Sequence, residues 1–183
     1  MYYAYICFGT QTIMAISKLN DHQARLIWVS LDVQPYGCSN QYGNPSGHCL
    51  CTMGISFACW LDYNSTAIKN QAMKMSSIGW RIFWLIVQMT FACSIGYSRM
   101  FLGVHALNQV LYGFMLGIWF ALTSEFFVKE PMMKLVDDLI FQKEARLSML
   151  LYYSTATLVV TFIMQIINYI VVANQFVNPP EWS

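Results

Sequence analysis

The sequence predicts an all-α membrane protein, a polytopic bundle of about five transmembrane helices. Of its 183 residues, 57% are hydrophobic and 10% are charged, whereas an ordinary soluble domain has roughly 25% charged residues. A water-soluble protein of this size would leave much apolar surface in contact with water. The apolar stretches lack the period-two alternation of a β-barrel strand. We therefore interpret residues 1–183 as a single membrane-embedded domain.

Five apolar stretches are long enough, or nearly so, to cross a bilayer, which takes about 20 helical residues. They are residues 1–17, 47–61, 78–97, 106–128 and 148–173. The second is short, so we expect its helix to extend into the flanking polar turns. The first begins at residue 1 without a basic leader, so no cleavable signal peptide is predicted.

The segment after the fourth stretch, residues 129–147, is predicted to contain an amphipathic helix that lies on the membrane surface. It starts near Pro131, a residue that is favoured in the first turn of a helix. Behind this proline, apolar residues recur at helical spacing. They are Met132, Leu135, Val136, Leu139 and Ile140.

The ten cations predict the orientation. Seven belong to the side that carries the connections 62–77 and 129–147, namely Lys69, Lys74, Arg81, Lys129, Lys134, Lys143 and Arg146. The other side has only Lys18, Arg25 and Arg99. The positive-inside rule places the first side in the cytoplasm and the second in the lumen or exterior. The glycosylation sequon at Asn64 is then cytoplasmic, and we expect it to be unmodified.

Other site classes find little support. Five of the six cysteines lie in apolar stretches, unlike those of a secreted disulfide framework. The pair Cys49 and Cys51 has no second pair with which to hold a metal, and no carboxylate cluster is suited to Mg²⁺. No basic stripe indicates nucleic-acid binding. We expect no metal, cofactor or nucleic acid.

The predicted exterior side carries the chemistry. Lys18 and Arg25 are seven residues apart, so on one helix they would share a face and converge on one anion. Asn44-Pro45-Ser46-Gly47-His48 then begins the second apolar helix. Its hydroxyl, its free backbone N–H groups and its imidazole lie at the positive end of the helix dipole. This arrangement is typical of anion binding.

A third piece follows the third apolar stretch. Arg99 precedes His105 by six residues, and Gln109 lies one helical turn beyond this histidine. A glutamine at that spacing can hydrogen-bond an imidazole nitrogen and fix its tautomer. His22, by contrast, is interpreted as an incidental loop residue. The sequence thus predicts a phosphate site with two histidines on one face of the membrane.

These pieces resemble the three ordered motifs of the type-2 phosphatidic acid phosphatase and vanadium haloperoxidase superfamily. The motifs read Lys18-x6-Arg25, Pro45-Ser46-Gly47-His48 and Ser98-Arg99-x5-His105, and the resemblance runs from residue 18 to about 117. The most similar members are glucose-6-phosphatases, which the third motif resembles together with Gln109-Val110. The tail Pro180-Glu181-Trp182 resembles them more faintly. Residues 109–113 also resemble dolichyl-diphosphatases.

The resemblance implies a metal-independent phosphohydrolase. His105 would be the nucleophile that forms a phosphohistidine, and His48 the general acid and then base. Gln109 would orient the nucleophile. The phosphate-binding groups would be Lys18, Arg25, Ser46, Gly47 and Arg99. Two positions depart from the common pattern: Leu26 stands where most members have proline, and Gln109 where many have aspartate.

The motifs do not define the alcohol that carries the phosphate. Glucose 6-phosphate or a related soluble ester is the first expectation, and a lipid phosphate or dolichyl diphosphate is the alternative. A catalytically inactive membrane scaffold is a further alternative, whereas a transporter is disfavoured because the apolar stretches contain almost no charge. By the resemblance we expect an endoplasmic reticulum protein with a luminal site. Superfamily members usually have another helix before the first motif, so a fragment of a longer protein would read identically.

Overall fold

The computed structural model describes residues 2–29, 42–69 and 78–141, together with separate helical residues between 148 and 170. All regular structure in these residues is helical, which confirms the predicted all-α class. The elements are α1 (Tyr2–Asp21), α2 (Leu26–Val29), α3 (Gly47–Lys69), α4 (Ile78–Phe101), α5 (Leu107–Thr123), the π-helix η2 (Ser124–Val128) and α6 (Lys129–Phe141).

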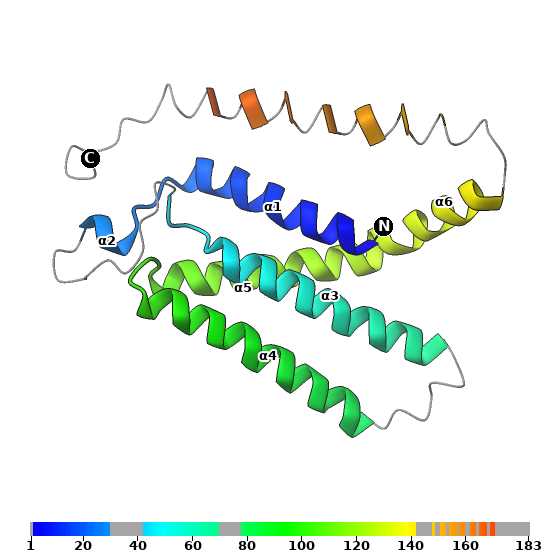
Figure 1. The fold of residues 1–183 in the computed structure, drawn as a ribbon, viewed down its shortest axis with the longest axis horizontal. Coiled ribbons are helices and arrows are strands. Elements are labelled where there is room, and N and C mark those ends of the chain that lie inside the picture. The colour runs from blue at the N-terminus through cyan, green and yellow to red at the C-terminus, as the bar shows by residue number, and fades with distance from the viewer. Residues whose placement is uncertain are drawn as a thin grey trace.

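The long helices α1, α3, α4 and α5 lie side by side, and α3 packs against the other three (Figure 1). The chain reverses direction from each of these helices to the next. The ends of α1 and α4 therefore meet the beginnings of α3 and α5 at one end of the bundle, on the left of Figure 1. This end brings together the three sequence motifs.

Two glycines allow α5 to approach α3 closely. A Cβ atom on Gly113 would lie 2.7 Å from the carbonyl oxygen of Ser46, and one on Gly117 would lie 2.7 Å from that of Leu50. Small residues four apart are typical of contacts between membrane helices, because without side chains the backbones can touch. The packing fixes the start of α5 beside the start of α3, and so fixes the second motif relative to the third.

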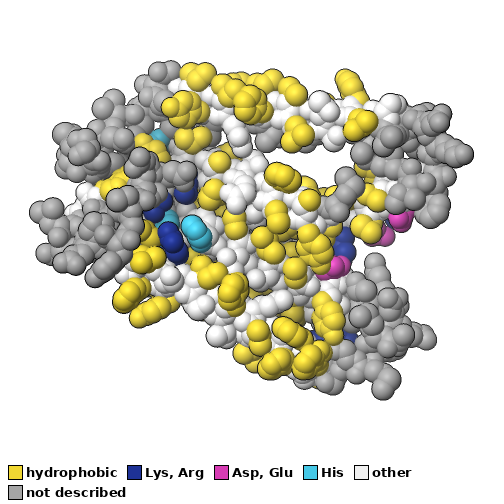
Figure 2. All heavy atoms as spheres, in the orientation of Figure 1, with side chains coloured by type: hydrophobic (Ala, Val, Ile, Leu, Met, Phe, Trp, Pro, Cys, Tyr) yellow, Lys and Arg dark blue, Asp and Glu magenta, His cyan; other side chains and the backbone are white. Residues whose placement is uncertain are grey.

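Two helices in the described part of the chain are long and apolar enough to cross a membrane, Ile78–Phe101 and Leu107–Asp138. Large hydrophobic side chains cover much of the visible surface (Figure 2), and α4 exposes Trp80, Phe83, Ile86 and Phe91. Helices α1 and α3 have 20 and 23 residues. At about 1.5 Å per residue, both are as long as a bilayer core is thick.

The short second stretch is extended as expected, since α3 continues through Asp62 and Asn64 to Lys69. The amphipathic helix predicted around Pro131 is present as α6, which begins two residues earlier, at Lys129. Helix α6 continues directly from α5 through the π-helix η2. A proline inside an α-helix clashes with the carbonyl four residues earlier, which here belongs to Phe127. The π-helix widens the turn that contains this carbonyl, and the helix passes the proline without a break.

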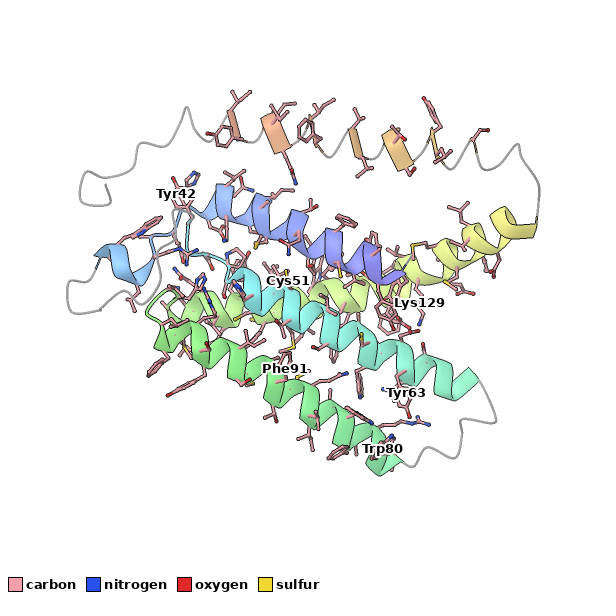
Figure 3. All side chains as sticks on the ribbon, in the orientation of Figure 1. Tyr42, Cys51, Tyr63, Trp80, Phe91 and Lys129 are labelled. Atoms are coloured by element: carbon pink, nitrogen blue, oxygen red, sulfur yellow. The ribbon has the colours of Figure 1, made fainter. Side chains whose placement is uncertain are left out.

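A polar network closes the opposite end of the bundle, where Lys129 is labelled in Figure 3. The Nζ atom of Lys129 lies 2.6 Å from Asp62 and 2.5 Å from Glu125. The hydroxyl of Tyr2 donates to Glu125 at 3.1 Å, and that of Tyr3 donates to Asp62 at 2.5 Å. The network ties α1, α3, η2 and α6 together at the end away from the motifs.

Candidate active site

The first motif lies where α1 ends. Lys18 is in the last turn of this helix, which stops at Asp21, and Arg25 lies in the loop beyond it. The expectation that both cations share one helix face is therefore wrong. The physical reason is His22, whose φ of 45° is left-handed and cannot continue a right-handed helix.

Arg25 nevertheless reaches the third motif. Its side chain is buried, with 3% of its surface exposed. The Nη1 atom donates to the carbonyl oxygen of Val104 at 3.1 Å and lies 3.4 Å from Nε2 of His105. Two motifs that are 80 positions apart in the sequence thus meet at one imidazole.

The turn between α4 and α5 presents His105 to Arg25. The N–H of Leu102 donates to Ser98 at 3.0 Å and that of Gly103 to Met100 at 2.9 Å, which closes the end of α4. Gly103 has a φ of 70°, a left-handed conformation that favours glycine and commonly terminates helices. The chain then reverses and leaves His105 buried, with 2% of its surface exposed, just before α5 begins.

Gln109, in the first turn of α5, determines which nitrogen of His105 carries the proton. Its Oε1 atom accepts the N–H of Ala106 at 3.3 Å, and its Nε2 atom donates to the carbonyl oxygen of Ala24 at 3.0 Å. These two contacts fix the orientation of the amide, so Oε1 faces Nδ1 of His105 at 3.2 Å. An acceptor there requires a proton on Nδ1. Nε2 of the neutral ring then keeps its lone pair.

The second motif adjoins this pair through the backbone. The N–H of Ser46 donates to the carbonyl oxygen of Gln109 at 3.0 Å. The hydroxyl of Ser46 is buried, beside the thiol of Cys49, and has no hydrogen-bond partner among the described residues. Gly47 begins α3, and His48, the next residue, has an exposed side chain. The backbone of Ser46 therefore joins the start of α3, with its hydroxyl and its accessible imidazole, to the residue that faces His105.

Positive charge is concentrated at this end, where Lys, Arg and His side chains gather in Figure 2. Burial lowers the pKa of Lys18 to about 8, and the charges of Arg25 and Arg99 contribute to the shift. The pKa of Arg25 is lowered as well, by burial and then by Arg99. His48 is within electrostatic range of all three cations. Bringing an anion to this place would relieve their mutual repulsion.

His105 is held in its neutral form. Burial lowers its pKa to about 4, with the charge of Arg25 as the next cause, while the hydrogen bond to Gln109 opposes the shift. At neutral pH the imidazole is therefore uncharged, and a lone pair on Nε2 is what nucleophilic attack requires. The geometry fits an imidazole nucleophile beside an anion site. Among the described residues, no group of three or more His, Cys, Asp or Glu side chains is placed to hold a metal ion.

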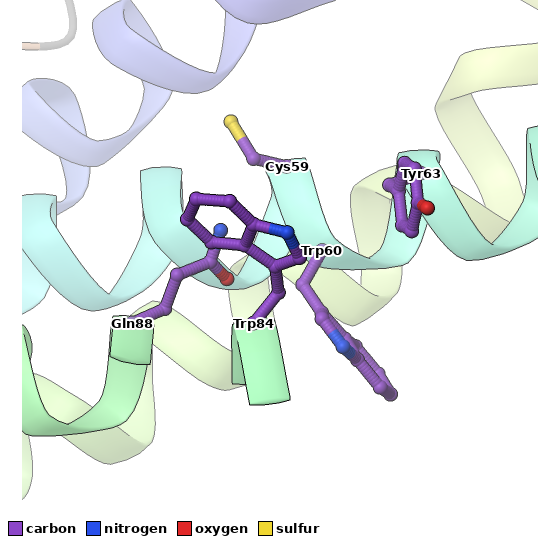
Figure 4. A pocket seen from close by; sticks show the side chains of 5 residues that line it. All are labelled: Cys59, Trp60, Tyr63, Trp84 and Gln88. Atoms are coloured by element: carbon purple, nitrogen blue, oxygen red, sulfur yellow. The ribbon is translucent and has the colours of Figure 1, made fainter. Parts of the chain in front are cut away.

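A separate cavity of about 270 Å³ lies between α3 and α4 (Figure 4). Its lining consists of Cys59, Trp60, Tyr63, Trp84 and Gln88. None of these belongs to the three motifs. The cavity is therefore distinct from the candidate site at the three motifs.

A family model describes the same region. The model of the PAP2 superfamily matches residues 2–130, well over half of the chain. The chain belongs to the PAP2 superfamily. The predicted resemblance is thereby confirmed, and the match includes every motif residue from Lys18 to Gln109.

Within the PAP2 superfamily, the curated relatives are glucose-6-phosphatases. The chain is 37% identical to mouse glucose-6-phosphatase 3 over 84 residues, and 33% identical to the human protein over the same length. Each match covers 45% of this chain and 23% of the relative. The chain therefore matches under a quarter of the length of these relatives. No solved structure matches it.

Several contacts of this PAP2 site carried no signal in the sequence. The carbonyl groups of Ala24 and Val104 are backbone acceptors, so their residue types reveal nothing. The amide of Asn44 donates to Asp21 at 3.1 Å, which links the second motif to the end of α1. Asn44 adjoins a motif, and that proximity was the only available hint. His22 packs edge-on against Tyr42, with ring centroids 4.9 Å apart.

Proposed function

We propose that this chain is an integral-membrane phosphohydrolase of the glucose-6-phosphatase type. The observation that carries the proposal is the contact of Arg25 with His105, 3.4 Å from Nη1 to Nε2. The cation proposed to bind phosphate is then next to a neutral imidazole whose unprotonated nitrogen is defined by Gln109. The sequence similarity to glucose-6-phosphatase 3 supports the substrate class.

In the first step, Nε2 of His105 attacks phosphorus. The new N–P bond forms as the P–O bond to the alcohol breaks, and protonated His48 gives its proton to the leaving oxygen. Arg25, Lys18 and Arg99 stabilise the charge on the equatorial oxygens. Ser46, through its hydroxyl, and Gly47, through its N–H, complete the set of donors.

In the second step, the phosphohistidine is hydrolysed. Neutral His48 takes a proton from water, and the resulting hydroxide attacks phosphorus. The N–P bond breaks, phosphate leaves, and the lone pair returns to Nε2 of His105. Both histidines regain their starting protonation states. Every charge in the cycle is balanced by side chains of this chain, so the proposed reaction is independent of a metal ion.

The proposed protein crosses the membrane about five times, with the site on the luminal side of the endoplasmic reticulum. Support comes from the distribution of cations and from the helices of membrane-spanning length. Helices α1 and α3 would be two of the five spans. The residues between 148 and 170, which are helical where the structure describes them, belong to the fifth.

Phosphate release from the purified chain in detergent tests the proposal. Glucose 6-phosphate, phosphatidate and dolichyl diphosphate form the substrate panel, and His105→Ala is the inactive reference. We expect glucose 6-phosphate to be hydrolysed fastest and the variant to release none above background. Faster hydrolysis of phosphatidate or dolichyl diphosphate would show that the substrate is a lipid phosphate instead of a sugar phosphate. No release from any of the three would favour an inactive scaffold.

A further inference from the structure

The side chain of Gln109 touches more of the site than the orientation of one imidazole requires. Its Oε1 atom faces Nδ1 of His105 at 3.2 Å, while its Nε2 atom donates to the carbonyl oxygen of Ala24 at 3.0 Å. Ala24 immediately precedes Arg25. One amide therefore contacts the loop that carries the phosphate-binding cation as well as the proposed nucleophile.

Two backbone hydrogen bonds between described residues flank the carbonyl of Ala24 in the loop. The carbonyl of Gln23 accepts the N–H of Gly43 at 2.8 Å, and the carbonyl of Arg25 accepts the N–H of Trp28 at 3.0 Å. Between these two bonds, the carbonyl of Ala24 is held by the amide of Gln109. This bond fixes the backbone directly before Arg25, whose guanidinium then reaches Val104 and His105.

Only an amide can make both contacts. A carboxylate at position 109 could still accept a hydrogen bond from the Nδ1–H group of His105. It has no hydrogen to donate to the carbonyl oxygen of Ala24. Two oxygens would then face each other where the structure has a hydrogen bond. Gly43 makes room for the donor group, since a Cβ atom there would lie 2.6 Å from Nε2 of Gln109.

We propose that Gln109 is a positioning residue for Arg25 as well as for His105, so that a single side chain sets the distance between the phosphate-binding cation and the nucleophile. The inference rests on the proposed function, because it assumes that Arg25 binds phosphate. It adds that the NH₂ group of Gln109 governs anion affinity through the Arg25 loop. A carboxylate at this position would orient the nucleophile and leave the cation loosely held.

The test is a double-mutant cycle on the affinity for orthovanadate, a phosphate analogue, measured with the full chain in detergent. We expect Gln109→Glu to weaken vanadate binding about 10-fold and Arg25→Ala to weaken it at least as much. Because Gln109 acts through Arg25, the double variant should bind within about twofold of Arg25→Ala alone. Gln23→Glu makes the same chemical change in the same loop, on an exposed side chain, and is the matched control for added negative charge.

Gly43→Ala is a second variant that should disturb the hydrogen bond between Gln109 and the carbonyl of Ala24. It crowds the amide of Gln109, with the added Cβ 2.6 Å from Nε2 and 2.7 Å from Oε1, and leaves the chemistry of that residue intact. Its effect on vanadate affinity should also disappear in the Arg25→Ala background, and this variant serves if Gln109→Glu fails to fold. The inference would be overturned if the losses of vanadate affinity in the single variants multiplied in the double variant of either cycle. Wild-type affinity in both Gln109→Glu and Gly43→Ala would also overturn it. Absence of vanadate binding by the wild-type chain would instead overturn the proposed function.

Discussion

Arg25 and His105 meet at the centre of the site, with Nη1 of the guanidinium 3.4 Å from Nε2 of the imidazole. The same Nη1 atom donates to the carbonyl oxygen of Val104 at 3.1 Å, so its position is fixed by the backbone of the α4–α5 turn. A cation this close opposes protonation of the ring. It also lies where the oxygens of a phosphate attacked by Nε2 would gather.

Replacing Arg25 is expected to weaken transition-state binding. Arg25→Ala should lower kcat/KM about 10²- to 10³-fold, as removal of one oxyanion-type donor does elsewhere. Arg25→Lys should recover only part of this loss, because an ammonium group lacks the planar fork that reaches Val104 and a phosphate together. Steady-state phosphate release measures both variants. Arg81→Lys, at the other end of α4, is the control, and equal losses in the two lysine variants would contradict the role of Arg25.

The two histidines should fail in different ways. With p-nitrophenyl phosphate, whose leaving group needs little protonation, His48→Ala should still form a phosphoenzyme and then hydrolyse it about 10²- to 10⁴-fold more slowly. His105→Ala should form none. Labelling with a ³²P-phosphate ester separates the two outcomes, with the reaction quenched in alkaline detergent because the N–P bond of a phosphohistidine is labile in acid. His22→Asn, which tolerates the left-handed φ at that position, is the control histidine. Labelling of His105→Ala at the wild-type level would exclude the mechanism.

Acid should destabilise the fold through His105. Its pKa is about 4 in the folded protein, against about 6.5 when unfolded. The unfolded chain therefore binds more protons between these values, and stability falls as the pH drops from 6.5 to 4, by about 3 kcal/mol at most. The groups that act on the ring are Arg25, Gln109, Arg99 and Lys18.

Thermal unfolding in detergent at pH 7 and pH 4.5 measures this contribution. The wild-type Tm should fall more between the two pH values than that of His105→Gln, whose amide does not titrate. Parallel pH dependences would show that this imidazole is not held neutral by the fold.

Gly117 should tolerate no side chain. A Cβ atom there would lie 2.7 Å from the carbonyl oxygen of Leu50 and 2.9 Å from the nitrogen of Gly54, and backbone atoms cannot turn aside. Gly117→Ala should therefore destabilise the protein by about 1–3 kcal/mol. Gly79→Ala, at an exposed position in α4, makes the same change and should be neutral or stabilising. Unfolding in detergent compares them, and a lower Tm for Gly79→Ala than for Gly117→Ala would refute the packing argument.

The orientation can be tested with two matched glycosylation sites. Tyr42→Thr turns Asn40-Gln41-Tyr42 into a sequon, and Ala72→Thr turns Asn70-Gln71-Ala72 into the same tripeptide. We expect the first to be glycosylated in microsomes and the second to remain unmodified, because the cation distribution places them on opposite sides. An endoglycosidase-sensitive mobility shift reports each modification. A shift for Ala72→Thr alone would invert the topology. The native sequon at Asn64 is less informative, because it lies within α3 and its amide donates to Trp60.

Hydropathy and motif spacing predicted the helical class and the contact of Gln109 with His105. These features depend on local periodicity or on side-chain chemistry that the sequence displays. The proximity of Lys18 and Arg25 was predicted from a shared helix face, whereas only Lys18 lies in the helix. Spacing alone cannot reveal that the helix ends at Asp21, before the left-handed His22, since the spacing is the same whether or not the helix continues.

The remaining errors and omissions come from tertiary structure. The sequence predicted the amphipathic helix around Pro131, but not the π-helix before it that joins α5 to α6. The acceptors at Ala24 and Val104 are carbonyl groups, which every residue has. Only the assembled bundle brings them to Gln109 and Arg25. Packing, rather than residue type, selects such contacts.

The network around Lys129 gives the two ends of the bundle unequal electrostatic character. There, one ammonium group faces two carboxylates, from Asp62 and Glu125, and two tyrosine hydroxyls donate to the same carboxylates. The positive charge of Lys129 is therefore already compensated by its own carboxylates. At the other end, Lys18, Arg25 and Arg99 gather close enough for their charges to act on one another. We therefore expect a phosphate ester to bind at the motif end of the bundle and to enter from the compartment that this end faces.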